Sequence, residues 1–127
     1  MKLVDTSLFI GYERGEALAA EKIAELLDAG ELVVSAVTRY ELTCSPSLRS
    51  PWREFYRDLF DAVPVLPVTS VSAALGAEAT ARAARGGTVK APDALIAGVA
   101  LEHGLPVVTA DADFLMLGTV VELVRAS

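Results

Sequence analysis

Cysteine and histidine are almost absent from this sequence, which contains one of each, Cys44 and His103. A single cysteine cannot form an internal disulfide, so the disulfide framework of small exported domains is excluded. We expect Cys44 to be a small core residue and His103 to lie at the surface near a helix end. A cytoplasmic location is therefore predicted.

Long apolar runs are also missing. The longest candidate, residues 94–101, is far shorter than the roughly 18 residues that a membrane-spanning helix needs. Asp5 interrupts the N-terminal apolar stretch almost at once, so we expect no signal peptide. No repeat, low-complexity segment or linker divides the chain, and we expect one domain over residues 1–127.

Positive charge is in the minority, with 11 lysines and arginines against 17 acids and a net charge of −6. This balance argues against a large nucleic-acid surface, because a polyanion is repelled overall. The basic residues are nevertheless grouped: one group is Arg39, Arg49, Arg53 and Arg57, and the other is Arg82, Arg85 and Lys90. The spacing of four from Arg49 to Arg57 places two or three of them on one helical face, as a substrate contact or as a solvated stripe.

Apolar periodicity and turn residues predict alternating strands and helices. Strands are expected over residues 2–5, 32–34, 63–68, 105–109 and 119–124. Helices are expected over residues 7–14, 16–29, 35–44, 70–85 and 92–103 and from Pro51 onward, with a helical turn over 111–116. Such alternation is typical of an α/β fold with three α/β/α layers and a mostly parallel central sheet. In such sheets ligands bind beyond the carboxyl ends of the strands.

Three aspartates stand where predicted strands end or predicted helices begin. Asp5 ends the first strand, and Asp111 follows the strand over 105–109 by two residues. Asp93 begins a helix. Each of them alone is explained as a helix cap, because short acids accept hydrogen bonds from first-turn N–H groups and oppose the helix dipole favourably.

Glu41 is harder to explain by secondary structure alone. The apolar face of its helix is predicted to consist of Ala36, Val37, Tyr40 and Cys44. Glu41 lies about 40° from Val37 at 100° per residue, so it borders that face. It is either a glutamate at the rim that reaches water or an acid held beside the core by a partner or a metal ion.

Taken together, the four acids predict a metal site. Carboxylates that converge on one sheet edge repel one another, and several ionised groups there require a cation. Oxygen ligands without histidine or cysteine suit Mg²⁺ or Mn²⁺ better than zinc. Such ions take only one or two protein carboxylates, so further coordination positions stay open to phosphate oxygens. The chemistry indicated is therefore hydrolysis of a phosphodiester.

Four short segments carry these acids in a characteristic order. The first two are residues 3–7 (LVDTS) and 35–42 (SAVTRYEL). The third is 92–97 (PDALIA), followed by 100–104 (ALEHG), and the fourth is 107–114 (VVTADADF). In this order and at these separations they resemble the motifs of the PIN domain family over essentially the whole chain. Each motif is weak alone, but four in register are specific.

In its small size the chain most resembles the VapC-type toxins of toxin–antitoxin pairs. The resemblance implies a PIN-like fold and an endoribonuclease that depends on Mg²⁺ or Mn²⁺ and cuts structured RNA such as tRNA or ribosomal RNA. It also implies a homodimer and inhibition by a small VapB-type antitoxin. The segment over 45–68 matches no motif, and substrate choice is a natural role for it.

The same resemblance assigns roles to individual residues. It makes Asp5, Glu41, Asp93 and Asp111 the acids of the catalytic and metal site. Thr6, Ser7 and Thr109 would support these acids or contact the substrate. Asp113 is an alternative or additional metal ligand beside Asp111.

Other interpretations compete with this one. A receiver domain carries adjacent acids after its first strand, where this chain has Thr6, and a phosphatase with an aspartyl nucleophile needs an acid at position 7, which is Ser7. A catalytically degenerate PIN-like module that only binds a protein or RNA stays open. The apolar stripe from Trp52 to Phe60 is expected to be core, or else a dimer or antitoxin groove. Gly86 and Gly87 are expected to form a turn.

Overall fold

The computed structural model describes residues 1–83 and 88–125. These residues form five strands, six α-helices and one short 3-10 helix. In chain order they are β1 (Lys2–Val4), α1 (Thr6–Glu13), α2 (Ala17–Asp28), β2 (Leu32–Ser35), α3 (Ala36–Thr43), α4 (Ser50–Ala62), β3 (Val65–Leu66), α5 (Ser70–Ala83), α6 (Ala91–His103), β4 (Val107–Thr109), η1 (Ala112–Met116) and β5 (Val121–Leu123). None of the described helices is long and apolar enough to cross a membrane.

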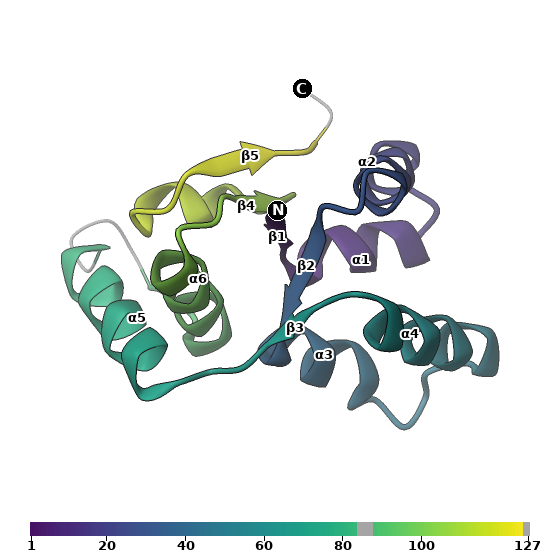
Figure 1. The fold of residues 1–127 in the computed structure, drawn as a ribbon, viewed down its shortest axis with the longest axis horizontal. Helices are drawn as coiled ribbons and strands as arrows, with labels where there is room; N and C mark the ends of the chain where they lie inside the picture. Colours follow the sequence, from purple (N-terminus) through teal and green to yellow (C-terminus); the bar gives the residue numbers. More distant parts are fainter. Residues whose placement is uncertain (84–87, 126–127) are drawn as a thin grey trace.

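The strands form one sheet in the order β3-β2-β1-β4-β5, and every pair is parallel (Figure 1). Leu3 of the central strand lies opposite Val33 on one side and Val107 on the other. The strand order therefore reverses at β1: β2 and β3 follow on one side of it, and β4 and β5 follow on the other. In parallel sheets with such a reversal of strand order, ligands bind beyond the carboxyl ends of the strands at the point of reversal.

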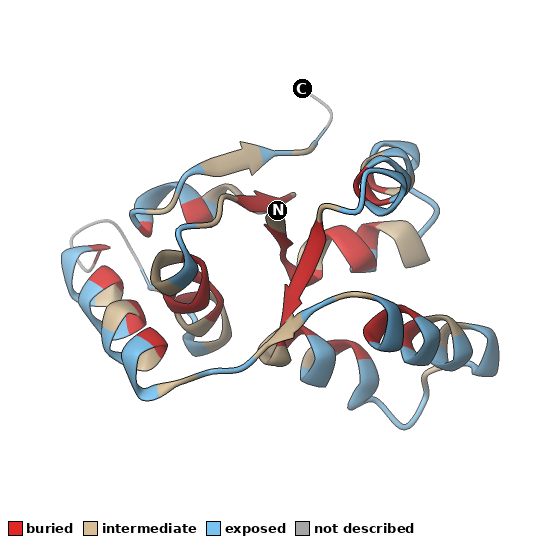
Figure 2. Cartoon of the chain, in the orientation of Figure 1, coloured by how far each residue is buried: buried red, intermediate tan, exposed pale blue. Residues whose placement is uncertain are grey.

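Helices cover both faces of the sheet because neighbouring strand residues point to opposite sides. Val4, Val34 and Val108 pack into a core that includes residues of α1, α2 and α4. Leu3, Val33 and Val107 pack against α5, α6 and η1. Figure 2 shows the buried strands between these two helical layers. The predicted three-layer α/β/α fold is confirmed, and its sheet is parallel throughout.

The ends of several elements follow from local chemistry. Ser35 caps α3 by accepting a hydrogen bond from the backbone N–H of Thr38 at 3.2 Å. Pro51 stands in the first turn of α4. The strand predicted over residues 63–68 is confirmed only at Val65 and Leu66, which form β3 at one edge of the sheet. The predicted end of the helix at Arg85 and the turn at Gly86 and Gly87 lie outside the described residues.

The prediction of which residues of α3 are buried was wrong. Its buried residues are Thr38 and Leu42, whereas Tyr40 is 69% exposed. Cys44 is exposed as well, so the expectation of a core cysteine was also wrong. The helix packs through Thr38 and Leu42 on α1 and α4, and this contact outweighs the apolar character of the other side.

Candidate functional site

The four candidate acids come from elements that meet at the carboxyl edge of the sheet. Asp5 directly follows β1, and Asp111 follows the adjacent strand β4 by two residues. Asp93 lies in the first turn of α6, whose last residues lead into the start of β4, so its first turn lies at the opposite, carboxyl end. Glu41 lies in α3, which begins where β2 ends.

Asp5 is held by hydrogen bonds to both of its carboxylate oxygens. Oδ1 accepts from the backbone N–H of Ser7 at 2.8 Å and from the Ser7 hydroxyl at 2.6 Å. Oδ2 accepts from the Thr109 hydroxyl at 2.9 Å. Asp5 thus caps α1, as predicted for a single acid, while its side chain stays fixed at the sheet edge.

Thr109 connects Asp5 to Asp111. Its hydroxyl is fully buried, donates to Asp5 and accepts a hydrogen bond from the backbone N–H of Asp111 at 2.9 Å. Asp111 in turn caps η1 by accepting from the backbone N–H of Asp113 at 2.9 Å. One threonine therefore sets the spacing between two candidate acids from adjacent strands.

The half-buried Glu41 side chain is fixed by a hydrogen bond from a residue of α1. The Thr6 hydroxyl donates to Glu41 Oε1 at 2.6 Å and lies 3.1 Å from the hydroxyl of Thr38. The sequence analysis did not single out Thr38, which is fully buried. A signal for it was present, because Ser35, Thr38 and Glu41 are spaced by three and share one side of the helix.

Electrostatics links all four carboxylates. The pKa of Asp93 is raised to about 6, first by burial and then by three neighbouring carboxylates. These belong to Asp5, Asp111 and Glu41. The ammonium group of Lys90 opposes this rise without cancelling it. Burial also raises the pKa of Asp5, against the hydrogen bonds from Ser7 and Thr109. Asp93 is therefore the acid on which the charges of the other three act.

The donor chemistry of these acids suits a hard divalent cation, since all four supply carboxylate oxygen. In residues 1–83 and 88–125, however, no three acidic, imidazole or thiol groups stand close enough together to hold a metal ion. Like charges that repel one another favour such separation when no cation is bound. Asp113 is exposed and is not among the carboxylates that raise the pKa of Asp93.

A Thr109→Val substitution is expected to weaken Mg²⁺ or Mn²⁺ binding by about 10- to 100-fold, because it releases Asp5 from its fixed orientation. Calorimetric titration with Mn²⁺ measures this. Thr109→Ser is the matched variant, since it restores the hydroxyl and should restore most of the affinity. Equal affinities in the wild type and the valine variant would show that Thr109 does not position Asp5.

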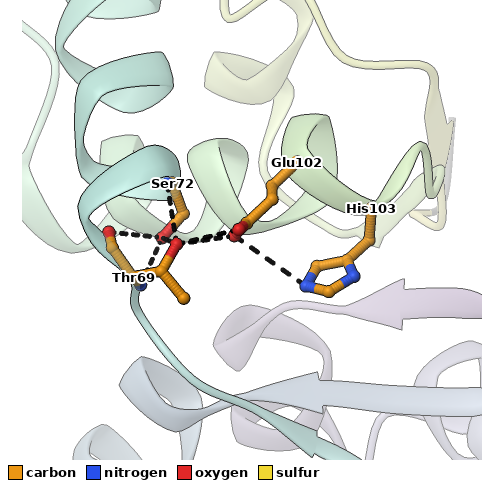
Figure 3. Close-up of polar contacts among 4 residues, drawn as sticks. All are labelled: Thr69, Ser72, Glu102 and His103. Carbon is orange, nitrogen blue, oxygen red and sulfur yellow. Dashed lines mark hydrogen bonds and ion pairs between the residues drawn. The ribbon is translucent and has the colours of Figure 1, made fainter.

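A second polar cluster joins α5 to α6 away from the four acids. The Thr69 hydroxyl donates to the Glu102 carboxylate at 2.9 Å and accepts from the Ser72 N–H at 3.1 Å (Figure 3). The Ser72 hydroxyl accepts from the Thr69 N–H at 2.7 Å. His103 is exposed, as predicted, with Nε2 3.9 Å from Glu102. The cluster caps α5 reciprocally, so its role is structural.

The predicted arginine stripe is only partly free to meet a substrate. Arg49, Arg53 and Arg57 are all exposed. Arg53 donates to the carbonyl oxygens of Leu48 and Ser45, both at 2.9 Å, and so fixes the loop between α3 and α4. Arg57 lies 3.5 Å from Asp58. Of the second group, Arg82 pairs with Glu78, and Arg85 lies outside the described residues.

A family model and several solved structures match nearly the whole chain. The model of the family described as PIN domain matches residues 2–118. FitAcB from Neisseria gonorrhoeae has 23% identity and a TM-score of 0.78, over 95% of this chain and 96% of that chain. DNA-bound VapBC from Salmonella typhimurium has 24% identity and a TM-score of 0.76, over 96% and 98%. VapBC-5 from Mycobacterium tuberculosis, a member of the VapBC family of toxin–antitoxin systems, has 28% identity and a TM-score of 0.65, over 98% of both chains. No curated protein matches the chain.

Proposed function

The chain belongs to the PIN domain family, and on this basis we propose that it is an endoribonuclease that depends on Mg²⁺ or Mn²⁺. PIN domains are typically metal-dependent nucleases. The proposed substrate is structured RNA such as tRNA or ribosomal RNA, and the proposed location is the cytoplasm. Asp5, Glu41, Asp93 and Asp111 are the proposed catalytic and metal-binding acids.

The observation that carries this proposal is the electrostatic effect of three carboxylates, at the ends of β1 and β4 and in α3, on Asp93 at the start of α6. Their mutual influence is strongest at Asp93, whose half-buried side chain has no arginine or lysine within ion-pair distance among the described residues. A fold that gathers negative charge in this way is unfavourable unless a cation binds. A helix-capping role explains the positions of Asp5 and Asp111. It does not explain the position of Glu41 or the effect of the other three carboxylates on the pKa of Asp93.

The chain's own residues would bind and orient the reacting groups. A divalent ion bound by these acids would activate water and stabilise the charge that develops on the phosphate. Thr109 and Ser7 hold Asp5, and Thr6 holds Glu41, so these hydroxyls keep the carboxylates in place. Asp113 stays an alternative ligand in this proposal, because it lies next to Asp111 and its backbone N–H donates to the Asp111 carboxylate.

The direct test is cleavage of tRNA and ribosomal RNA by the purified protein. Cleavage is expected with Mg²⁺ or Mn²⁺ and should be lost in EDTA, because the proposed reaction needs a divalent ion to activate water. Gel electrophoresis and mapping of the new 5′ ends measure it. A folded protein that leaves every RNA intact under these conditions would favour the degenerate binding module instead.

A homodimer is also part of the proposal. The side of α3 that carries Tyr40 forms an apolar groove with Val68 and Leu95, of about 390 Å³. Tyr40→Asp is expected to shift the protein from dimer to monomer in size-exclusion chromatography with light scattering, because a charge in an apolar interface is strongly unfavourable. Val120→Asp is the matched control, since Val120 is 75% exposed and does not line this groove. A monomeric wild type would contradict the dimer.

The proposed inhibitor is a small VapB-type antitoxin. Support comes from the relatives, among them a toxin–antitoxin complex from Klebsiella pneumoniae. Co-expression with small proteins encoded beside this chain should yield a complex that copurifies and suppresses RNA cleavage. If none of these neighbours binds, the antitoxin part of the proposal fails while the nuclease part stands.

A further inference from the structure

A polar pocket of about 310 Å³ lies beside the acid group, between α1, α3 and the start of α4. Its polar lining consists of Glu13, Glu41, Ser45, Ser47 and Arg49, and Trp52 contributes an aromatic wall. Glu41 thus belongs both to the acid group and to this pocket. The volume is at the lower end of the roughly 300–1,000 Å³ of small-molecule sites, which suits a single nucleobase.

Hydrogen bonds and aromatic contacts outside the pocket fix the residues that line it. Arg53 fixes the loop that carries Ser45 and Ser47 through its hydrogen bonds to two loop carbonyls. Trp52 packs edge-on against Tyr12 and Phe55, with ring centroids 5.2 and 5.8 Å away. Such support keeps an aromatic side chain ready to contact an unstacked base.

Glu13 gives the pocket its hydrogen-bonding character. Its Oε2 accepts a hydrogen bond from the buried hydroxyl of Tyr56. Burial, together with this carboxylate, raises the pKa of Tyr56 far above its ordinary value, so the tyrosine keeps its proton and stays a donor. Glu13 is therefore an acceptor-only group, with Oε1 and a further lone pair left for a ligand.

An acceptor-only carboxylate selects among the four bases. The Watson–Crick edge of guanine presents two adjacent N–H donors, at N1 and N2, which match the two oxygens of one carboxylate. Adenine, cytosine and uracil each present one donor beside acceptors, so one carboxylate oxygen would face a lone pair. Bidentate, charge-assisted pairs of the first kind are the stronger ones. Serine hydroxyls and Arg49 supply donors for the guanine O6 and the attached phosphate.

We propose that this α3–α4 pocket binds one unpaired guanine of the RNA substrate next to the bond that is cut. The proposal rests on the proposed ribonuclease function and adds base specificity to it. Recognition of an unpaired base is the usual way in which proteins read RNA sequence. It also gives a role to the segment over 45–68, which matches no family motif.

Fluorescence of Trp52 tests the proposal, because Trp52 is the only tryptophan of the chain. The protein is titrated separately with GMP, AMP, CMP and UMP in EDTA, so that no metal contributes to binding. GMP is expected to bind about tenfold more tightly than the other three. Glu13→Gln should reduce this preference to about twofold or less, since it replaces one acceptor by a donor. Glu54→Gln, on the exposed side of α4, should behave as the wild type.

Equal binding of the four nucleotides, or a GMP preference that survives Glu13→Gln, would overturn the proposal. Circular dichroism identifies a Glu13→Gln protein that has not folded. In that case the base profile of wild-type cleavage in a random RNA pool decides, because guanine must be enriched at one position beside the cut. RNA cleavage without any guanine preference overturns the pocket assignment alone. GMP binding without RNA cleavage overturns the nuclease function alone.

Discussion

Asp93→Asn is expected to lower metal-dependent RNA cleavage by about 10²- to 10³-fold while making the metal-free protein more stable at neutral pH. The loss of activity follows because the variant removes a negative charge from the centre of the four acids. The gain in stability follows from the same charge. Few structural residues combine these two effects, so the pair of measurements is diagnostic.

The sign of the stability effect comes from the pKa of Asp93. Its value of about 6 in the folded protein lies above the ordinary 3.8, so the folded state holds this proton more tightly than the unfolded state does. As pH rises from about 4 to above 6, the wild type should lose stability relative to the asparagine variant, which mimics the protonated side chain. Because Asp93 is only half-buried, we expect a difference of roughly 1 kcal/mol at pH 7, or about 4 °C in melting temperature.

Thermal melts in EDTA from pH 4 to pH 8, with RNA cleavage at pH 7, measure both effects. Asp61→Asn is the control, because Asp61 is exposed on α4 and does not contribute to the pKa of Asp93. Mg²⁺ should stabilise the wild type more than Asp93→Asn. If Asp93→Asn melts at a lower temperature and cleaves RNA normally, Asp93 is a helix-capping residue and the metal site is excluded.

Gly98→Ala is expected to destabilise the fold by about 3 kcal/mol, and Gly98→Val more, because α5 and α6 touch through their backbones. A Cβ atom at Gly98 would overlap the carbonyl oxygen of Ser72, and one at Gly76 would overlap that of Ala94. Backbone atoms cannot rotate away as a side chain can. The two helices, which lie side by side in Figure 1, must therefore separate or tilt.

The matched control is Gly11→Ala in α1. A Cβ atom there would meet the end of the Glu16 side chain, which can move, and Ala19 at 3.3 Å. The helix-propensity gain of roughly 0.5–1 kcal/mol should offset this adjustment, so stability should hardly change. Chemical denaturation measures all three variants. Because α6 carries Asp93 in its first turn, Gly98→Ala should also weaken Mn²⁺ binding, and unchanged stability would refute the close packing.

Much of this protein was determined by the sequence itself. Helix and strand positions depend on local periodicity and capping, so the alternation of elements and the Ser35 cap could be predicted from residues a few positions apart. The parallel sheet then placed Asp5 and Asp111 at one edge, because both follow strands. The four acids could therefore be singled out from the sequence.

Contacts between distant residues were decided only by the tertiary structure. The hydrogen bond from Thr109 to Asp5 spans 104 positions in the chain, and no local pattern encodes it. The exposure of Cys44 and Tyr40 depends on which side of α3 meets α1 and α4, and an apolar pattern that is present on both sides cannot settle this. The α3–α4 pocket and the contact at Gly98 have the same origin, since each arises where separate elements pack and leave, or fill, the space between them.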